Sequence, residues 1–116
     1  MRVLAVWEEC NFIHGEWQHQ SIPSFWIEAR HDAIDRVLPY ARDAAALREE
    51  IDRNRTDPNG PFYLLVTRNL ESVVSLPGYY PYSGQWFGGS PFRELPPVEL
   101  EDLADLPKIA DRLLAK

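Results

Sequence analysis

Short runs of β-branched and aromatic residues, partly alternating with polar ones, occupy the first 30 positions of the chain. Such runs predict three strands, over residues 3–7, 12–20 and 24–30, and Gly15 marks a bulge or a tight turn inside the second run. The three strands are expected to form an antiparallel meander.

The apolar period changes from two to about 3.6 residues at Asp32, which predicts a long amphipathic helix over residues 32–53. Pro39 removes one hydrogen bond and crowds the preceding turn, so we expect a kink or two abutting helices broken at Leu38. The helix should end near Asn54, because a dense turn signal follows at residues 56–61.

The second half of the chain is less regular. Residues 62–67 form a compact apolar run that predicts a buried strand. Residues 69–76 fit either a return strand or a short helix, and their β-branched pair Val73 and Val74 favours the strand. Residues 77–97 hold five of the ten prolines and four of the six glycines, which excludes regular helix there.

Helical spacing returns from Val98 to the end of the chain, with Pro107 suited to the first turn of a final helix. The predicted fold class is therefore α+β. An antiparallel sheet of four to five strands is packed by the helix over residues 32–53, with a C-terminal helix. The core is expected to contain Ile34, Leu38, Leu47, Ile51, Leu64 and Val66.

Length and charge narrow the classes of function. The 116 residues suit a single domain, and 45% hydrophobic residues suit a folded one. The 18 acidic side chains outnumber the 12 basic ones, and the basic ones are scattered, which argues against direct binding of nucleic acid. A lone Cys10, no leader-like start and no long apolar stretch indicate a cytoplasmic protein that does not cross a membrane.

The side chains that suggest metal binding are poorly spaced for it. Structural zinc sites pair ligands two to four residues apart, and in a strand over 12–20 the side chains of His14 and His19 would point to opposite faces. The sequence therefore predicts no metal and no other cofactor. The candidates considered are Cys10, His14, His19 and His31.

Catalytic chemistry is also weakly supported. The neighbouring Glu8 and Glu9 would raise the pKa of the Cys10 thiol and disfavour the thiolate that a nucleophile requires. Acidic residues on neighbouring predicted strands could form an acid–base pair, although solvent-facing carboxylates are the commoner case. These residues are Glu8, Glu9, Glu16 and Glu28. We predict that the chain is not an enzyme.

Residues 79–92 combine six aromatic side chains with proline and glycine, a composition that binding surfaces favour. The same aromatic residues could instead cover the sheet as a lid on the core, and the two interpretations are compatible. The predicted partner-binding residues of this loop are Tyr79, Tyr80, Tyr82, Trp86 and Phe87, with the acidic residues Glu99, Glu101, Asp102 and Asp105 as a second contact surface.

The first 50 residues resemble the HicB-like antitoxin domain. The resemblance lies in the strand at 3–7, the segment Gly15-Glu16-Trp17, the segment over 22–29 and the helix from Asp32, and it departs at Ser24, where the family usually has glycine. The resemblance implies a meander-plus-helix domain that neutralises a toxin by binding it, without catalysis. It gives no individual residue a role.

These observations predict a non-enzymatic inhibitor that binds and neutralises another protein, of the immunity, antitoxin or anti-defence type. A basic toxin or a nucleic-acid-handling enzyme is the kind of partner that an acidic surface would attract. The alternative is a small enzyme or ligand-binding domain with a pocket under the aromatic loop 79–92. The sequence does not predict the oligomeric state.

Overall fold

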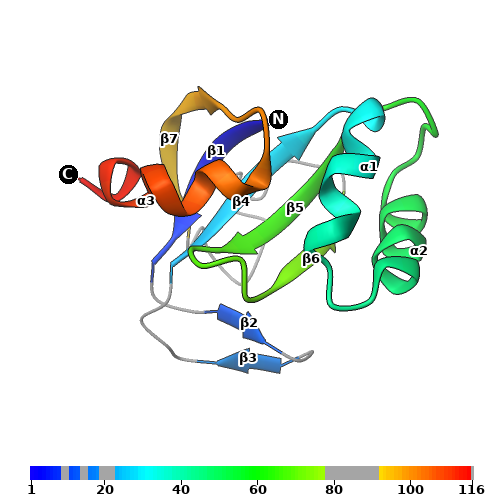
Figure 1. The fold of residues 1–116 in the computed structure, drawn as a ribbon, viewed down its shortest axis with the longest axis horizontal. Helices are drawn as coiled ribbons and strands as arrows, with labels where there is room; N and C mark the ends of the chain where they lie inside the picture. Colours follow the sequence, from blue (N-terminus) through cyan, green and yellow to red (C-terminus); the bar gives the residue numbers. More distant parts are fainter. Residues whose placement is uncertain (9–10, 14–15, 19–22, 78–91, 116) are drawn as a thin grey trace.

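A five-stranded antiparallel sheet in the order β6-β5-β4-β1-β7 is the main feature of the structure (Figure 1). The structure is a computed structural model that describes residues 1–8, 11–13, 16–18, 23–77 and 92–115. The strands of this sheet are Arg2–Trp7 (β1), Ser24–Ala29 (β4), Phe62–Thr67 (β5), Val73–Leu76 (β6) and Phe92–Glu99 (β7). Together with three α-helices, the sheet confirms the predicted α+β class.

The strand predicted over residues 12–20 is wrong as one element. Two short strands, Asn11–Ile13 (β2) and Glu16–Gln18 (β3), occupy this region and pair with each other in a separate two-stranded sheet. This small sheet extends beyond the end of the large sheet at which β1 stops and β4 starts (Figure 1). Because β1 pairs directly with β4, the expected meander of three consecutive strands is also wrong.

The long helix predicted over residues 32–53 is wrong as one element. The chain instead forms a short helix Ile34–Val37 (α1), flanked by 3₁₀ turns at His31–Ala33 and Leu38–Tyr40, and then a separate helix Ala44–Asn54 (α2). Pro39 lies in the second 3₁₀ turn. Proline cannot donate a helical hydrogen bond, so the α-helix does not run through this position.

The expected alternative of two helices broken at Leu38 is confirmed in part. Helix α1 ends at Val37, the 3₁₀ turn Leu38–Tyr40 follows, and residues 41–43 separate this turn from α2. Ala41 is extended, with φ −79° and ψ 145°, and Asp43 caps α2 by accepting a hydrogen bond from the backbone N–H of Ala46 at 3.1 Å. The apolar period continues across the break because both helices contribute to the same core, in which Val37 and Ile51 are fully buried. The predicted end of the helix at Asn54 is confirmed.

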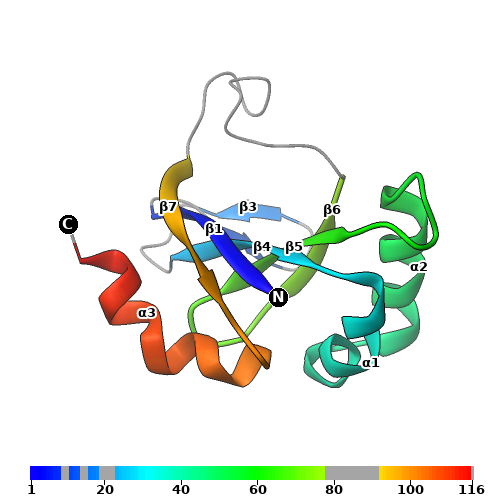
Figure 2. The same ribbon diagram turned by 90° about the horizontal axis from the view of Figure 1, so that it is seen from above.

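The three helices lie on one side of the five-stranded sheet (Figure 2). Between helices and sheet is the larger apolar core, and five of the six predicted core residues are buried in it, whereas Leu38 is only partly buried. The opposite side of the sheet carries a second buried cluster, formed by Leu4, Ala5, Trp7, Trp26, Leu65, Leu76 and Phe92. Strand β1 supplies both clusters, and the irregularity between Val3 and Ala5 places the adjacent Leu4 and Ala5 in the same one.

The segment after β5 resolves the ambiguity at residues 69–76, because Val73–Leu76 is a strand, as favoured. A tight turn precedes it, in which Leu70 has a φ of 62°, unusual for a residue other than glycine. The hydroxyl of the buried Thr67 supports this turn by accepting hydrogen bonds from the backbone N–H groups of Glu71 (2.8 Å) and Ser72 (3.1 Å).

The predicted helix from Val98 is partly wrong, because β7 continues through Glu99 and the helix Leu106–Leu114 (α3) begins later, after a 3₁₀ turn at Leu103–Asp105. Pro107 lies in the first turn of α3, as predicted. Strand β7 accommodates two prolines because its pairing with β1 is irregular there, passing from Val98 directly to Glu94.

Candidate functional site

The aromatic loop lies almost entirely outside the described residues, and with it the predicted contacts Tyr79, Tyr80, Tyr82, Trp86 and Phe87. Phe92, at the end of this segment, is the first residue of β7 and is 7% exposed. Its ring lies 5.5 Å from that of Trp7 and 5.7 Å from that of Trp26. The last aromatic residue of the segment therefore belongs to the core, and the roles of the others remain predictions.

Two of the four predicted acidic contacts form the cap that precedes α3. The Asp102 carboxylate accepts hydrogen bonds from the backbone N–H of Ala104 (2.9 Å) and from the hydroxyl of Tyr40, while Asp105 Oδ2 accepts one from the Asp102 N–H at 3.3 Å. The bond from Ala104, followed by the bond from Tyr40, lowers the pKa of Asp102 below its ordinary value. The same contact with Asp102 raises the pKa of Tyr40.

The other two predicted acidic contacts, Glu99 and Glu101, are exposed. Glu99 lies opposite Arg2 in the β1–β7 pairing, and the backbone carbonyl of Glu101 accepts a hydrogen bond from Arg36 at 3.0 Å. The four acidic residues thus differ in their surroundings. A contact role for Asp102 and Asp105 would compete with their role as capping groups.

The candidate carboxylate pair is not brought together in the structure. Glu28 lies at one end of the sheet, bound by Arg2 at 2.5 Å and by the hydroxyl of Tyr63 at 3.2 Å, whereas Glu8 follows the other end of β1 and pairs with Arg93 at 3.3 Å. Burial, and then Glu28, raises the pKa of Tyr63. Glu9 and the side chain of Glu16 lie outside the described part of the chain. Glu8 and Glu28 are therefore ion-pair partners of arginines in separate places.

The candidate metal ligands are largely untested. His31 is exposed in the first 3₁₀ turn, and Cys10, His14 and His19 lie outside the described residues. Among the residues that the structure does describe, no three histidine, cysteine or acidic side chains are grouped so as to hold a metal ion. None of the helices found there has the length and apolar character needed to cross a membrane.

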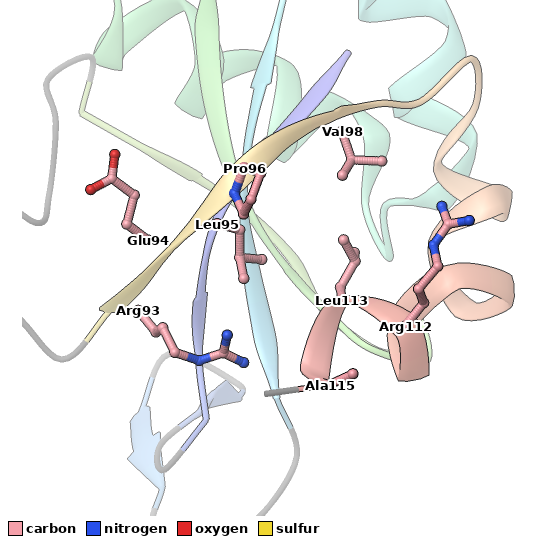
Figure 3. Close-up of a pocket in the computed structure, with 8 residues that line it drawn as sticks. All are labelled: Arg93, Glu94, Leu95, Pro96, Val98, Arg112, Leu113 and Ala115. Atoms are coloured by element: carbon pink, nitrogen blue, oxygen red, sulfur yellow. The ribbon is translucent and has the colours of Figure 1, made fainter.

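A groove between the edge strand β7 and helix α3 is the clearest candidate site in the described part of the chain, with a volume of about 290 Å³. Figure 3 shows Leu95 and Val98 of β7 facing Leu113 of α3 across it. Leu95 and Leu113 are buried at its base, Val98 is partly buried, and Pro96 and Ala115 are exposed. The groove is therefore apolar along most of its length.

Two arginines, Arg93 and Arg112, lie on opposite sides of the apolar part of the groove (Figure 3). The two-residue period of β7 turns Arg93 to the same side as Leu95, while Glu94 points to the other side of the strand. Arg93 is balanced by Glu8, and the side chains of this pair are 34% and 32% exposed. Within the described residues the guanidinium of the exposed Arg112 has no ion-pair partner, so Arg112 is the unpaired cationic group beside the apolar part of the groove, whose lining also includes Glu94.

This groove was not predicted from the sequence. The prolines at 96 and 97 argue against a strand at the position of one wall. The residues of the other wall show only the pattern of a helix with an apolar face and a polar flank. The alternation Phe92-Arg93-Glu94-Leu95 was the available signal, since it places Arg93 and Leu95 on one face of a strand.

Comparisons with known proteins do not place the chain in a family. No protein-family model, no curated protein and no solved structure matches it. The resemblance of its first 50 residues to the HicB-like antitoxin domain accordingly stays a prediction.

Proposed function

We propose that this chain is a non-enzymatic inhibitor that binds and neutralises another protein, of the immunity, antitoxin or anti-defence type, acting in the cytoplasm. The observation that carries the proposal is the apolar groove between β7 and α3, with arginines on both sides. An apolar base rimmed by charged side chains is the usual organisation of a protein-binding surface.

The ionisable groups of the described residues also favour binding over catalysis. The groups whose pKa shifts are Arg2, Tyr40, Tyr63 and Asp102. The main cause is a side-chain hydrogen bond for Arg2 and Tyr40, burial for Tyr63, and the neighbouring Ala104 N–H for Asp102. A poised acid or base usually lies in a cleft with its pKa moved toward neutrality. Tyrosine pKa values that are raised, and an aspartate pKa that is lowered, move away from neutrality instead.

The alternative is a small enzyme or ligand-binding domain with a pocket under loop 79–92. It rests on a segment outside the described residues, so the groove gives the inhibitor proposal the firmer support. The net charge of −6 further favours a partner with a basic surface, which long-range attraction would bring to the chain.

Co-expression with the proteins encoded next to this chain's own gene tests the proposal. We expect one of these proteins to form a stoichiometric complex with the chain, measured by size-exclusion chromatography with light scattering, and to lose its activity in that complex. A chain that forms no such complex, yet binds or converts a small molecule, would instead support the alternative.

A further inference from the structure

We infer that the groove between β7 and α3 binds an acidic segment of the partner protein, anchored by one large apolar side chain and docked through side chains rather than by strand addition. The inference rests on the proposed function and names the chemistry of the segment that this site recognises. The partner segment that binds the groove is acidic, whereas the net negative charge of the whole chain favours a basic partner surface.

The charge of the groove selects an anionic segment. The Arg112 guanidinium has no ion-pair partner among the described residues, and Arg93 shares its charge only with the partly exposed Glu8 at 3.3 Å. An aspartate or glutamate of the partner beside Arg112 would pair with a charge that is otherwise unbalanced. A lysine or arginine at the same place would face a like charge, which is unfavourable.

The size of the groove fits a side chain as the apolar anchor. Sites for small molecules and cofactors usually measure roughly 300–1,000 Å³. The groove, at about 290 Å³, lies at the lower end of this range. Its base consists of the side chains of Leu95 and Leu113. A single leucine, phenylalanine or tryptophan flanked by carboxylates therefore matches both its volume and its chemistry.

The edge of β7 argues against a partner that adds a strand to the sheet. Pro96 and Pro97 have no backbone N–H. Because successive N–H groups of a strand point to opposite edges, one of the two prolines removes a donor from the free edge near its middle. The register shift of β7 against β1 disturbs the same place. A helix or a turn of the partner that presents side chains to the groove avoids both obstacles.

Peptide titration of the full chain tests the inference. The probes are a 12-residue peptide with a central phenylalanine flanked by aspartate and glutamate, and the same peptide with lysine at the acidic positions. We expect the acidic peptide to bind more tightly and to shift the NMR methyl signals of Leu95, Val98 and Leu113. The net charge of −6 alone favours the basic peptide, so tighter binding of the basic peptide would overturn the inference.

Charge reversal at one exposed position provides the matched test. Arg112→Glu should weaken binding of the acidic peptide about fivefold to tenfold, because an attractive contact becomes repulsive. Arg53→Glu makes the same change in net charge on the exposed surface of α2, away from the groove, and should leave the affinity within about twofold. Equal effects of the two substitutions would show that only net charge matters and would refute the groove as the site.

Two further outcomes separate this inference from the proposed function. A stoichiometric partner complex whose affinity is unchanged by Arg112→Glu would refute the acidic segment while leaving the inhibitor proposal intact. Octanoate that binds the groove more tightly than the acidic peptide would show that a small apolar carboxylate, rather than a protein segment, is its occupant.

Discussion

The two outer strands of the five-stranded sheet, β6 and β7, protect their free edges in different ways. At β6, side chains of α2 bind the edge: Asn54 Nδ2 donates to the backbone carbonyl of Ser75 at 3.2 Å, and Glu50 accepts from the Ser75 N–H at 3.4 Å. At β7, the prolines 96 and 97 remove donors instead. Both arrangements oppose uncontrolled strand pairing.

The difference matters for access to the two edges. A helix that binds the edge of β6 also covers it, whereas prolines block pairing at β7 without covering the side chains beside it. The groove next to α3 therefore stays open to a partner. The edge of β6 is covered by α2, whereas β7 remains accessible to a partner that makes contacts through side chains.

The largest expected effect comes from removing the anchor of α2. Ile51 is fully buried, so Ile51→Ala should lower the free energy of unfolding by about 2–5 kcal/mol, because it leaves a cavity under the helix that covers β6. Urea denaturation followed by circular dichroism measures this loss. The exposed Glu49→Ala on the same helix is the control, and a comparable loss in the two variants would refute a specific anchoring role for Ile51.

A smaller effect is expected from opening the edge of β6 alone. Asn54→Ala removes the donor to the Ser75 carbonyl and hydroxyl, which should cost about 1–2 kcal/mol and accelerate amide hydrogen exchange in β6. Exchange measured by NMR reports the strand directly. If β6 exchanges no faster than in the Arg53→Ala control, its edge does not depend on this contact.

The next prediction concerns the cap that precedes α3, the helix that forms one wall of the groove beside β7. Asp102→Ala should lower the free energy of unfolding by about 1 kcal/mol, because it removes the acceptor for the Ala104 N–H and for Tyr40. Thermal unfolding measures the loss, with the neighbouring exposed Glu101→Ala as control. Equal losses in the two variants would contradict a capping role.

The same variant has a defined pH dependence. The pKa of Asp102 is lowered in the folded state, chiefly by the Ala104 N–H, so its carboxylate stabilises the fold above the ordinary aspartate value near 4. This contribution disappears as the pH falls through the lower folded-state pKa. The stability difference between the natural chain and Asp102→Ala should therefore shrink below about pH 4, and a difference that grows there would reverse the assigned sign.

An effect on stability as small as that of the cap is expected where the edge of β7 is restored. The double variant Pro96→Val and Pro97→Val regains both backbone N–H groups, one of them on the free edge, and should lose only about 1 kcal/mol, through greater freedom of the unfolded chain. It should nevertheless associate with itself more than the natural chain, as measured by analytical ultracentrifugation. Unchanged association would show that the prolines do not protect this edge.

The sequence predicted those strands that are buried along nearly their whole length. The runs at 3–7, 24–30 and 62–67 became β1, β4 and β5 because each strand supplies side chains to both buried faces of the sheet. The sequence predicted an interruption at Leu38 but not the non-helical residues 41–43, because the apolar residues of α1 and α2 keep a common period while they face one core. Asp43 was the local signal for the new helix, since aspartate is a favoured N-cap.

The candidate site was harder to predict than the fold. The prolines of β7 argue against a central strand, and they are acceptable because β7 lies at the sheet edge and pairs irregularly with β1 at this place. The groove requires Leu95 and Leu113 to meet, a contact that depends on how α3 returns to the sheet and not on local pattern. The predicted aromatic surface, by contrast, came from composition alone and lies outside the described residues.

The pairing of β1 with β7 has a consequence for the nascent chain. Arg2 lies opposite Glu99, and the backbone N–H of Leu100 donates to the Met1 carbonyl at 2.7 Å, so β1 pairs with a strand whose end lies almost 100 residues further along the chain. At about 5–20 residues per second, the ribosome needs roughly 5–20 seconds to supply that partner. Until then one side of β1 has no neighbour, and fragments that stop before Phe92 should aggregate.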